Sequence, residues 1–440
     1  MQTAAQAQRL LDRVLMLAKS AKGAVATASL RGTDGGNTRF AVNEITSSGD
    51  VERLSLSVTV QFGLRSATAS TNQLDDRSID DVVARATRMA RLAPENVEEL
   101  PPLARQRYAA VKAARDSKTA ELTPAERAKA AAAVIQAGDA TKVQIAGFYE
   151  HAAETFALAS TEGLWAHHAW TSCALSCTAR TPDGTGSGWA GASSNRAGDL
   201  DAAAMAKAAV DKAVASARPR KLAPGRYTVV LEPAAVASMT LVLAAQLGAR
   251  RAEEGRSFFA KPGGGTRIGD KLFPETITLR SDPTDTALTT PPFDGDGVPL
   301  APTRWIDKGS LRALSYGRYW AKKQGKPVTG TPAGWILEGG TATRDELIKG
   351  VKRGVLVTHL FYIRMLDPQG ILLTGLTRDG TFLIENGAIV APVMNFRFNE
   401  SPVHMLARCD GLTATTVVEG MRAPALRTHD FNLASLSEAV

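Results

Sequence analysis

The first half of the chain contains two successive passes of one pattern, a helix followed by strands and a second helix, and this repetition restricts the fold more than any other feature. Residues 2–21 carry leucine and valine at helical spacing, whereas the segments from Gly23 to Asn72 alternate apolar and polar residues. The next segment begins with Asp and Ser residues suited to cap a helix and ends before Pro94. We expect four antiparallel strands between these two helices.

The second pass starts with the helical sequence TPAERAKAAAAVIQAG and ends in DLDAAAMAKAAVDKAVASAR. Its predicted strands lie near 142–150, 153–160, 163–180 and 186–193. In both passes a strand ends in Ser-x-Asn, an acidic turn follows and a helix begins. We interpret this as an internal duplication of two units, 1–105 and 106–222.

The sequence changes character after the basic, proline-containing connector ARPRKLAPGR at 217–226. Helical patterns are confined to about 233–252 and to the short TRDELIKGVKRG, and the rest is strand-and-turn sequence rich in Gly and Pro. We therefore expect an α+β protein. It would consist of an N-terminal α/β domain, 1–222, and a C-terminal β-rich domain, 223–440.

Composition excludes several classes of protein. The net charge is +8, but basic residues are not gathered into one stripe or tail, which argues against nucleic acid as the partner. The most apolar window, Ala234 to Ala249, is shorter than the roughly 20 residues of a membrane span. Three cysteines, Cys173, Cys177 and Cys409, are too few for a disulfide framework. The sequence predicts a cytoplasmic protein without a membrane or nucleic-acid partner.

The histidines do not form a helical zinc motif, which needs two of them about four residues apart. None of the six has another at a spacing of three, four or five: His151, His167, His168, His359, His404 and His429. In LWAHHAWTSCALSC, strand alternation places the adjacent histidines on opposite faces and the two cysteines roughly 13 Å apart. We predict no metal site in this chain.

Other motifs give little chemistry. GSGWAG matches the dinucleotide fingerprint, but a strand follows it where the fingerprint requires a helix. A thiol nucleophile at Cys409, with His404 nearby in the sequence, stays an alternative to a buried structural cysteine. Two polar segments, ARRAEEGRSFF and GLTRDGTFLIENGAIV, are explained equally well by hairpin turns and by a functional site.

Taken together, several phrases resemble one family. They are TRFAVNEIT, STNQLDDRSIDDVVARATRMARLAP, STEGLW, PGRYTVVLEPAAVASMTLVL, EEGRSFF, SDPTD, DGDGVP, RYWAKKQG, LIKGVKRGVLVT and GLTRDGTFLIENGAIVAPV. Their order and spacing over nearly the whole chain are similar to those of the TldD/PmbA family, and within it of the PmbA (TldE) side.

The resemblance implies a two-subunit metallopeptidase that cleaves unfolded polypeptides or peptide precursors in an enclosed cavity. In the TldD-type subunit, a helix after the strand corresponding to YTVVL carries a His-Glu-x-x-x-His motif that holds zinc, and a later cysteine completes the site. This chain has LEPAAVAS there, with Glu232 and Pro233 near the start and no histidine after them. We do not assign the cysteine role to Cys409. Zinc is expected in the partner and no catalytic residue in this chain.

We therefore expect a non-zinc subunit that pairs with a TldD-like chain through its β-rich half and holds a peptide by strand addition. Glu254, Arg256, Arg378 and Asp379 are the candidate cavity or interface residues, because they lie in charged turns beside apolar strands. The isolated chain can also form a homodimer. Two alternatives stay open: a stand-alone binding or regulatory protein, and an independent hydrolase that uses Cys409.

Overall fold

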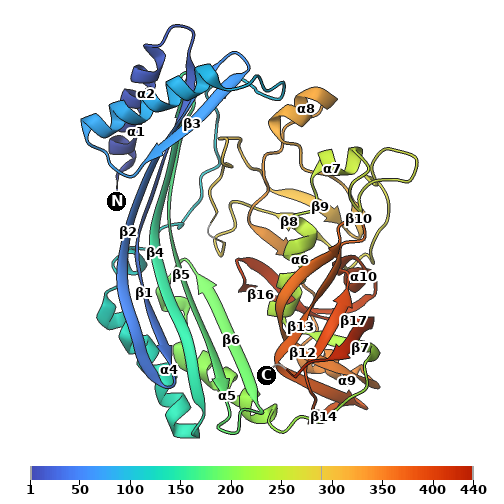
Figure 1. Ribbon diagram of the computed structural model, residues 1–440. Coiled ribbons are helices and arrows are strands. Elements are labelled where there is room, and N and C mark those ends of the chain that lie inside the picture. The colour runs from blue at the N-terminus through green and yellow to red at the C-terminus, as the bar shows by residue number, and fades with distance from the viewer. Residues whose placement is uncertain (1, 289, 439–440) are drawn as a thin grey trace.

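The computed structural model of the chain describes residues 2–288 and 290–438, and its elements fall into two groups (Figure 1). The first group, which ends at residue 215, is an antiparallel sheet with helices. The second group begins at residue 225 and consists mostly of strands. The predicted α+β class is confirmed. No helix within the described residues has the length and apolar character needed to cross a bilayer.

The N-terminal sheet has six strands in the order β3-β2-β1-β4-β5-β6, with every neighbouring pair antiparallel. Helix, three strands and helix occur twice along the chain, and β1 and β4, the first strands of the two sets, adjoin at the centre of the sheet. Duplication as the origin of this order stays a prediction. The strands are β1 (Val25–Ala41), β2 (Glu44–Phe62), β3 (Arg65–Thr71), β4 (Gln144–Ser160), β5 (Trp165–Arg180) and β6 (Ser187–Ser194).

Each set has three strands, so the expectation of four was wrong. No turn divides β1 after Arg31, because residues 33–36 continue the strand in register with both neighbours, and Asp34 lies opposite Glu52 and Ala153. A Cβ added to Gly35 would lie 2.2 Å from a backbone carbonyl oxygen of β4. This glycine permits close contact between strands and does not make a turn. The strands expected near 142–150 and 153–160 likewise form one strand, β4.

Four helices cover one face of this sheet in two pairs. They are α1 (Ala4–Lys19), α2 (Asp76–Leu92), α4 (Pro124–Thr141) and α5 (Ala202–Ala215), with a short α3 (Ser117–Ala120) and the 3-10 turn η1 (Ala197–Asp199) between them. The pair α1 and α2 packs with Leu30 and Val58 of the sheet, and the pair α4 and α5 packs with Phe40 and Leu175. Asp75 caps α2 through its side chain, as the acidic start of that segment predicts. The other face of the sheet is left for the second domain.

The C-terminal sheet has eleven strands, five of which form a closed ring. β7, β12, β13, β15 and β17 pair in succession, and β17 pairs again with β7; only β7 and β12 are parallel in this ring. The strands are β7 (Gly225–Leu231), β8 (Leu279–Ser281), β9 (Thr303–Asp307), β10 (Ser310–Leu311), β11 (Trp335–Leu337), β12 (Arg353–Asp367), β13 (Leu372–Glu385), β14 (Ala388–Pro392), β15 (Phe396–Glu400), β16 (Cys409–Val418) and β17 (Met421–Leu436).

The helix predicted over 233–252 is two helices in the structure. α6 (Pro233–Ala244) is a core helix, and the chain then leaves helical geometry until α7 (Ala249–Glu253) begins after Gly248. Glycine is a poor helix former, and the N–H of Ala249 bonds to Ser315 instead. The predicted helix at TRDELIKGVKRG is α9 (Arg344–Lys349). Two short helices that the sequence pattern did not indicate are α8 (Arg318–Gln324) and α10 (Pro402–Ala407).

The uncovered face of the N-terminal sheet looks toward the C-terminal domain (Figure 1). Phe293 of that domain packs against Tyr108 and Phe156, with ring centroids 4.9 and 5.5 Å away. The Tyr108 hydroxyl donates to the carbonyl of Gly297 at 2.8 Å. These contacts join β4 to the C-terminal domain at one place, and β6 makes a second contact described below.

Candidate functional site

At the edge of the N-terminal sheet, β6 meets the β12–β13 hairpin of the C-terminal domain. Ser187 and Trp189 are two residues apart on β6, so both side chains lie on the same face. His359 of β12 lies opposite Arg378 of β13, next to Asp379. The indole of Trp189 stacks on the imidazole of His359, with centroids 4.4 Å apart and 4° between the planes. Four side chains from two domains therefore form one cluster.

Asp379 is the centre of this cluster and is only 3% exposed. Its carboxylate accepts a hydrogen bond from the Ser187 hydroxyl at 2.5 Å and lies 3.0 Å from Nδ1 of His359. Burial would raise the pKa of Asp379, but the hydrogen bonds from His359 and Ser187 and the charge of Arg378 together lower it. An ionised Asp379 requires the proton to be on Nδ1 of His359. The φ of Asp379 is 55°, a left-handed conformation that Asp tolerates.

This arrangement does not make Ser187 a nucleophile. An activated serine donates its proton to a base, usually a histidine that a carboxylate orients. Here the hydroxyl of Ser187 donates directly to Asp379, and the serine is 3% exposed. The cluster instead holds the two domains together through buried, charge-assisted hydrogen bonds. We call it the domain clamp.

A cavity of about 460 Å³ opens beside the domain clamp. Its lining includes Trp189, His359, Phe361, Arg180 and Arg378, so we call it the cationic cavity. The guanidinium carbon of Arg378 lies 4.4 Å from the centroid of the Phe361 ring, which is 43% exposed. Asp379 also lines it and lies 3.9 Å from Nε of Arg378, so it offsets part of the positive charge of that guanidinium. The cavity therefore presents guanidinium groups and aromatic surface.

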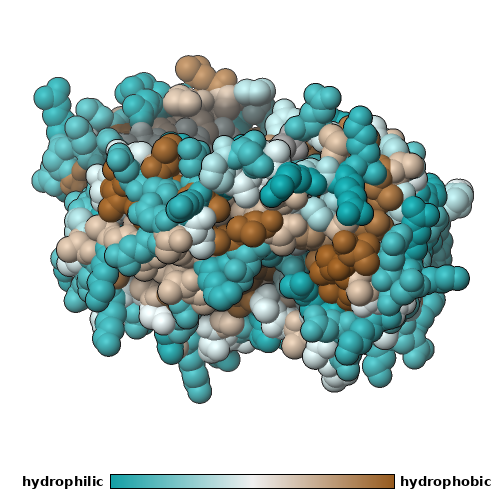
Figure 2. Space-filling model, turned by 90° about the horizontal axis from the view of Figure 1, so that it is seen from below, coloured by the Kyte–Doolittle hydropathy of each residue, from teal (hydrophilic) through white to brown (hydrophobic). Residues whose placement is uncertain are grey.

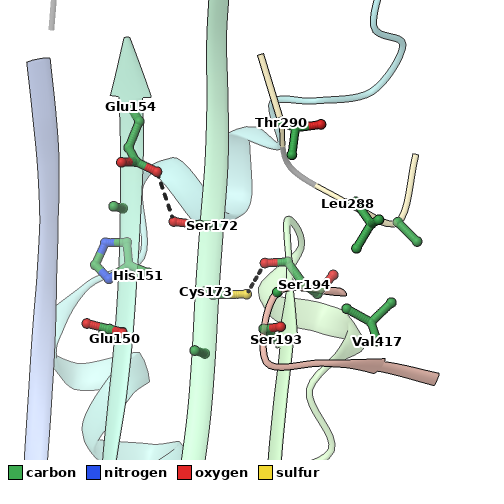
Figure 3. A pocket seen from close by; sticks show the side chains of 14 residues that line it. Glu150, His151, Glu154, Ser172, Cys173, Ser193, Ser194, Leu288, Thr290 and Val417 are labelled. Atoms are coloured by element: carbon green, nitrogen blue, oxygen red, sulfur yellow. Dashed lines mark hydrogen bonds between the residues drawn. The ribbon is translucent and has the colours of Figure 1, made fainter. Parts of the chain in front are cut away.

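A second cavity, of about 450 Å³, lies farther along the same face of the sheet (Figure 3). Glu150, Glu154 and Ser172 come from β4 and β5, and Leu288 and Val417 approach from the C-terminal domain. The Ser172 hydroxyl donates to Glu154 at 3.3 Å. We call this the acidic cavity, because glutamates are the charged side chains in its lining.

Glu254 and Arg256 lie in a different contact between the domains. Arg250 and Arg256 both pair with Glu254, and Arg250 also makes two hydrogen bonds of 2.7 and 2.8 Å to Glu98 of the N-terminal domain. Hydrogen bonds from these arginines lower the pKa of Glu254. Arg256 lines a cavity of about 760 Å³ that shares no residue with the cationic cavity. The structure thus places the four predicted residues in two separate pairs.

Glu232 precedes α6 and joins the two domains by ion pairs. Its side chain does not cap the helix; its oxygens lie 2.7 Å from Nζ of Lys212 on α5 and 3.4 Å from Arg344 on α9. These residues line a cavity of about 570 Å³ whose other wall includes Ile389 and Val390 of β14, 41% and 49% exposed. Figure 2 views the molecule from below and shows hydrophobic surface among hydrophilic groups.

The residues of α6 do not fit a zinc ion. After Pro233 the helix offers alanine, valine, leucine and methionine side chains, with the hydroxyls of Ser238 and Thr240 as its only oxygens. Ser238 donates its hydroxyl proton back to Ala234. Zinc sites in proteins use Cys, His, Asp or Glu. No group of three or more such residues that could hold a metal occurs in 2–288 or 290–438.

The cysteines do not offer an activated thiol. All three are free and buried. Burial raises the pKa of Cys409 to about 11 and those of Cys173 and Cys177 to about 12. A reactive cysteine needs a lowered pKa and partial exposure. The interpretation of Cys409 as a buried structural residue is favoured over the nucleophile.

Sequence reasoning missed three members of the domain clamp. His359 is one of six histidines without metal-ligand spacing, and Ser187 and Trp189 lie in GSGWAG, whose pattern resembles only a dinucleotide fingerprint. A polar His within the apolar run VLVTHLF was the available signal. The contact of Ser187 with Asp379 joins positions 192 residues apart, and no local pattern indicates it.

Comparisons with known proteins agree with this architecture. The family described as PmbA/TldA metallopeptidase matches through its C-terminal domain at residues 224–435 and its central domain at residues 109–217. A metalloprotease of Methanothermobacter thermautotrophicus is 25% identical over 158 residues, 33% of this chain and 34% of that protein. Metalloprotease PmbA of Escherichia coli is 29% identical over 133 residues, 29% of this chain and 28% of that protein. The chain thus spans about a third of the length of these relatives.

Solved structures share the fold over the full length. TldE from Thermococcus kodakarensis has a TM-score of 0.86 at 17% identity and covers 97% of this chain and 100% of its own. A Bacteroides thetaiotaomicron protein, crystallised as a candidate modulator of DNA gyrase, has a TM-score of 0.87 at 19% identity, covering 99% and 100%. Identities this low establish the common fold alone.

Proposed function

The chain belongs to the PmbA/TldD metallopeptidase family, and on that premise we propose that it is the non-zinc, TldE-type subunit of a two-subunit metallopeptidase. Its substrates are unfolded polypeptides or peptide precursors. Its partner is a TldD-like chain that binds the zinc. Free cysteines agree with a cytoplasmic location for the pair.

The observation that carries the proposal is the composition of α6. This helix follows β7 at the place where the family resemblance puts the zinc-binding helix, and its side chains pack into the C-terminal core. Ala235, Val236 and Met239 are fully buried there. When bound in the partner, zinc supplies an activated water and polarises the scissile carbonyl. In this chain α6 packs into the core and provides no zinc ligand.

What this chain contributes is a wall for the peptide. β6 is an edge strand of the N-terminal sheet, and it borders both the cationic and the acidic cavity. An edge strand offers backbone N–H and C=O groups to an extended peptide without regard to its sequence. The guanidinium groups of Arg180 and Arg378 add charge next to this edge.

The test is to purify the chain alone and together with a TldD-like chain encoded in the same genome. Metal analysis should give zinc in proportion to the partner only, and cleavage of an unfolded protein should require both chains. Removing the His-Glu-x-x-x-His motif from the partner should abolish cleavage, and restoring the motif should restore cleavage. Stoichiometric zinc and peptidase activity in the isolated chain would overturn the proposal. A chain that never associates with the TldD-like protein would support the stand-alone regulatory alternative.

A further inference from the structure

The cationic and acidic cavities lie on one strip of the N-terminal sheet. Alternate residues of β4 line first the cationic cavity, at Gln144 and Ala146, and then the acidic cavity, at Glu150, Ala152 and Glu154. Side chains two residues apart on a strand share a face. The two cavities are therefore successive parts of one surface, opposite the helix-covered face.

The strip between the two cavities is open. Phe148 lies between Ala146 and Glu150 on this face and is 36% exposed, which is unusual for a phenylalanine inside a sheet. Along β5, Ser172, Ala174, Ser176 and Thr178 are half-buried, and they alternate with fully buried residues that face the helices. The strip closes beyond Glu154, where Phe156 packs against Phe293. It is therefore a groove with one closed end, and we call it the interdomain groove.

The groove carries opposite charges at its two ends. Arg180 and Arg378 line the cationic cavity, and the exposed Arg39 lies opposite Phe148. At the other end, Glu150 is exposed and Glu154 is half-buried. Arg31, adjacent to Glu154 and stacked 3.6 Å above the Phe156 ring, reduces the negative charge there. The charge of Glu154 is therefore partly compensated.

The separation of the charges sets the length of a ligand. Gln144, opposite Arg180 in the sheet, is six residues from Glu150 along β4. At about 3.3 Å per residue this is about 20 Å, the length of an extended segment of about six residues. Small side chains such as Ala152, Ala174 and Ser176 leave space for a ligand over the sheet surface of the groove.

We propose that the interdomain groove binds an extended peptide in a charge-determined orientation, with acidic residues in the cationic cavity and basic residues in the acidic cavity. This inference rests on the proposed function, whose peptide it positions. Complementary charges select register more strongly than they raise total affinity. The groove thereby prefers chains whose acidic and basic residues are separated by about six positions.

The experiment uses the isolated full chain and two labelled peptides of equal composition, each about ten residues long. In one peptide, acidic and basic residues form separate end blocks; in the other, they alternate. Fluorescence anisotropy at about 50 mM salt should show about tenfold tighter binding of the block peptide, and the preference should shrink at about 300 mM salt because exposed charges are then screened. Equal affinities at low salt would overturn the proposal.

Variants of the charged residues test which end of the interdomain groove binds which peptide charge. The double variant Glu150→Gln, Glu154→Gln should remove the gain in affinity that a basic block gives and keep the gain in affinity that an acidic block gives. Arg180→Gln or Arg378→Gln should have the reverse effect. Glu121→Gln, at an exposed position outside the groove, is the matched control and should leave both gains intact. A control that changed binding as much as the groove variants would contradict the assignment. Zinc-dependent cleavage by the two-chain complex decides the proposed function separately, since this assay needs neither zinc nor partner.

Discussion

Replacing Asp379 by Asn tests whether the domain clamp depends on charge. Asn keeps the shape of the side chain and, like Asp, tolerates the φ of 55° at this position. It exchanges two charge-assisted hydrogen bonds, from Ser187 and His359, for neutral ones. Hydrogen bonds to charged groups contribute about 1 kcal/mol more than neutral ones. The substitution should therefore lower the free energy of unfolding by about 2 kcal/mol at neutral pH.

The pH dependence identifies the cause. The pKa of Asp379 is lower in the folded state than in the unfolded state, so its ionised form stabilises the fold above the unfolded value of about 4. This contribution is lost as the pH falls through the folded pKa. In urea unfolding curves, the gap between wild type and Asp379→Asn should be full at pH above about 5 and should narrow below about 4.

Two further variants bound the effect. Asp379→Ala removes the acceptor and leaves buried polar partners, so it should cost about 3–5 kcal/mol, more than Asn. Ser187→Ala removes one of the two hydrogen bonds to the carboxylate and should cost about 1–2 kcal/mol. If Asp379→Asn unfolded at the wild-type urea concentration, or if its deficit stayed constant down to pH 3, the electrostatic explanation of the clamp would be wrong.

Three other predictions concern the interdomain ion pair, a buried thiol and a close strand contact. Glu232→Gln leaves Lys212 without its anion, so it should cost about 2 kcal/mol and speed hydrogen exchange in α5, while unchanged exchange would argue against the ion pair. Cys409 should react with iodoacetamide about 100-fold more slowly than a free thiol at pH 8, because its pKa is raised to about 11; rapid native labelling would refute its burial. Gly147→Ala places a Cβ 2.3 Å from an aromatic ring and should cost about 3 kcal/mol, whereas the control Gly49→Ala, with nothing within 4 Å, should be near neutral in thermal unfolding.

The helices and the strand-rich second half could be predicted because their signals are local. Asp75 caps α2, and the segment that follows keeps a helical period until the proline. The number of N-terminal strands could not be predicted, since Gly35 resembles a turn residue in sequence and acts as a close-packing residue only when β4 lies beside it. Gly248 could have indicated the break between α6 and α7, but the apolar run on its N-terminal side continued the helical pattern past it.

The site residues also divide into those that the sequence indicated and those that it did not. Arg378 and Asp379 were expected in a charged turn, and this was wrong: both lie within β13, where they line a cavity. Their partners were not found, because the stacking of Trp189 on His359 depends on how two separately folded sheets dock. Glu254 has the same kind of charged sequence context but is held in a contact with Arg250. Sequence alone could not separate these two environments.

The closed ring of the C-terminal sheet has a consequence for how the protein is made. β17 pairs with β7, β11, β15 and β16, so the strand that closes the ring is the last of the five ring strands to leave the ribosome, whereas all six strands of the N-terminal sheet precede residue 195. The N-terminal domain can therefore acquire its structure during translation. The C-terminal half must wait with β7 unpaired on one side, and during that interval its exposed apolar strands are the part of the chain that needs protection from aggregation.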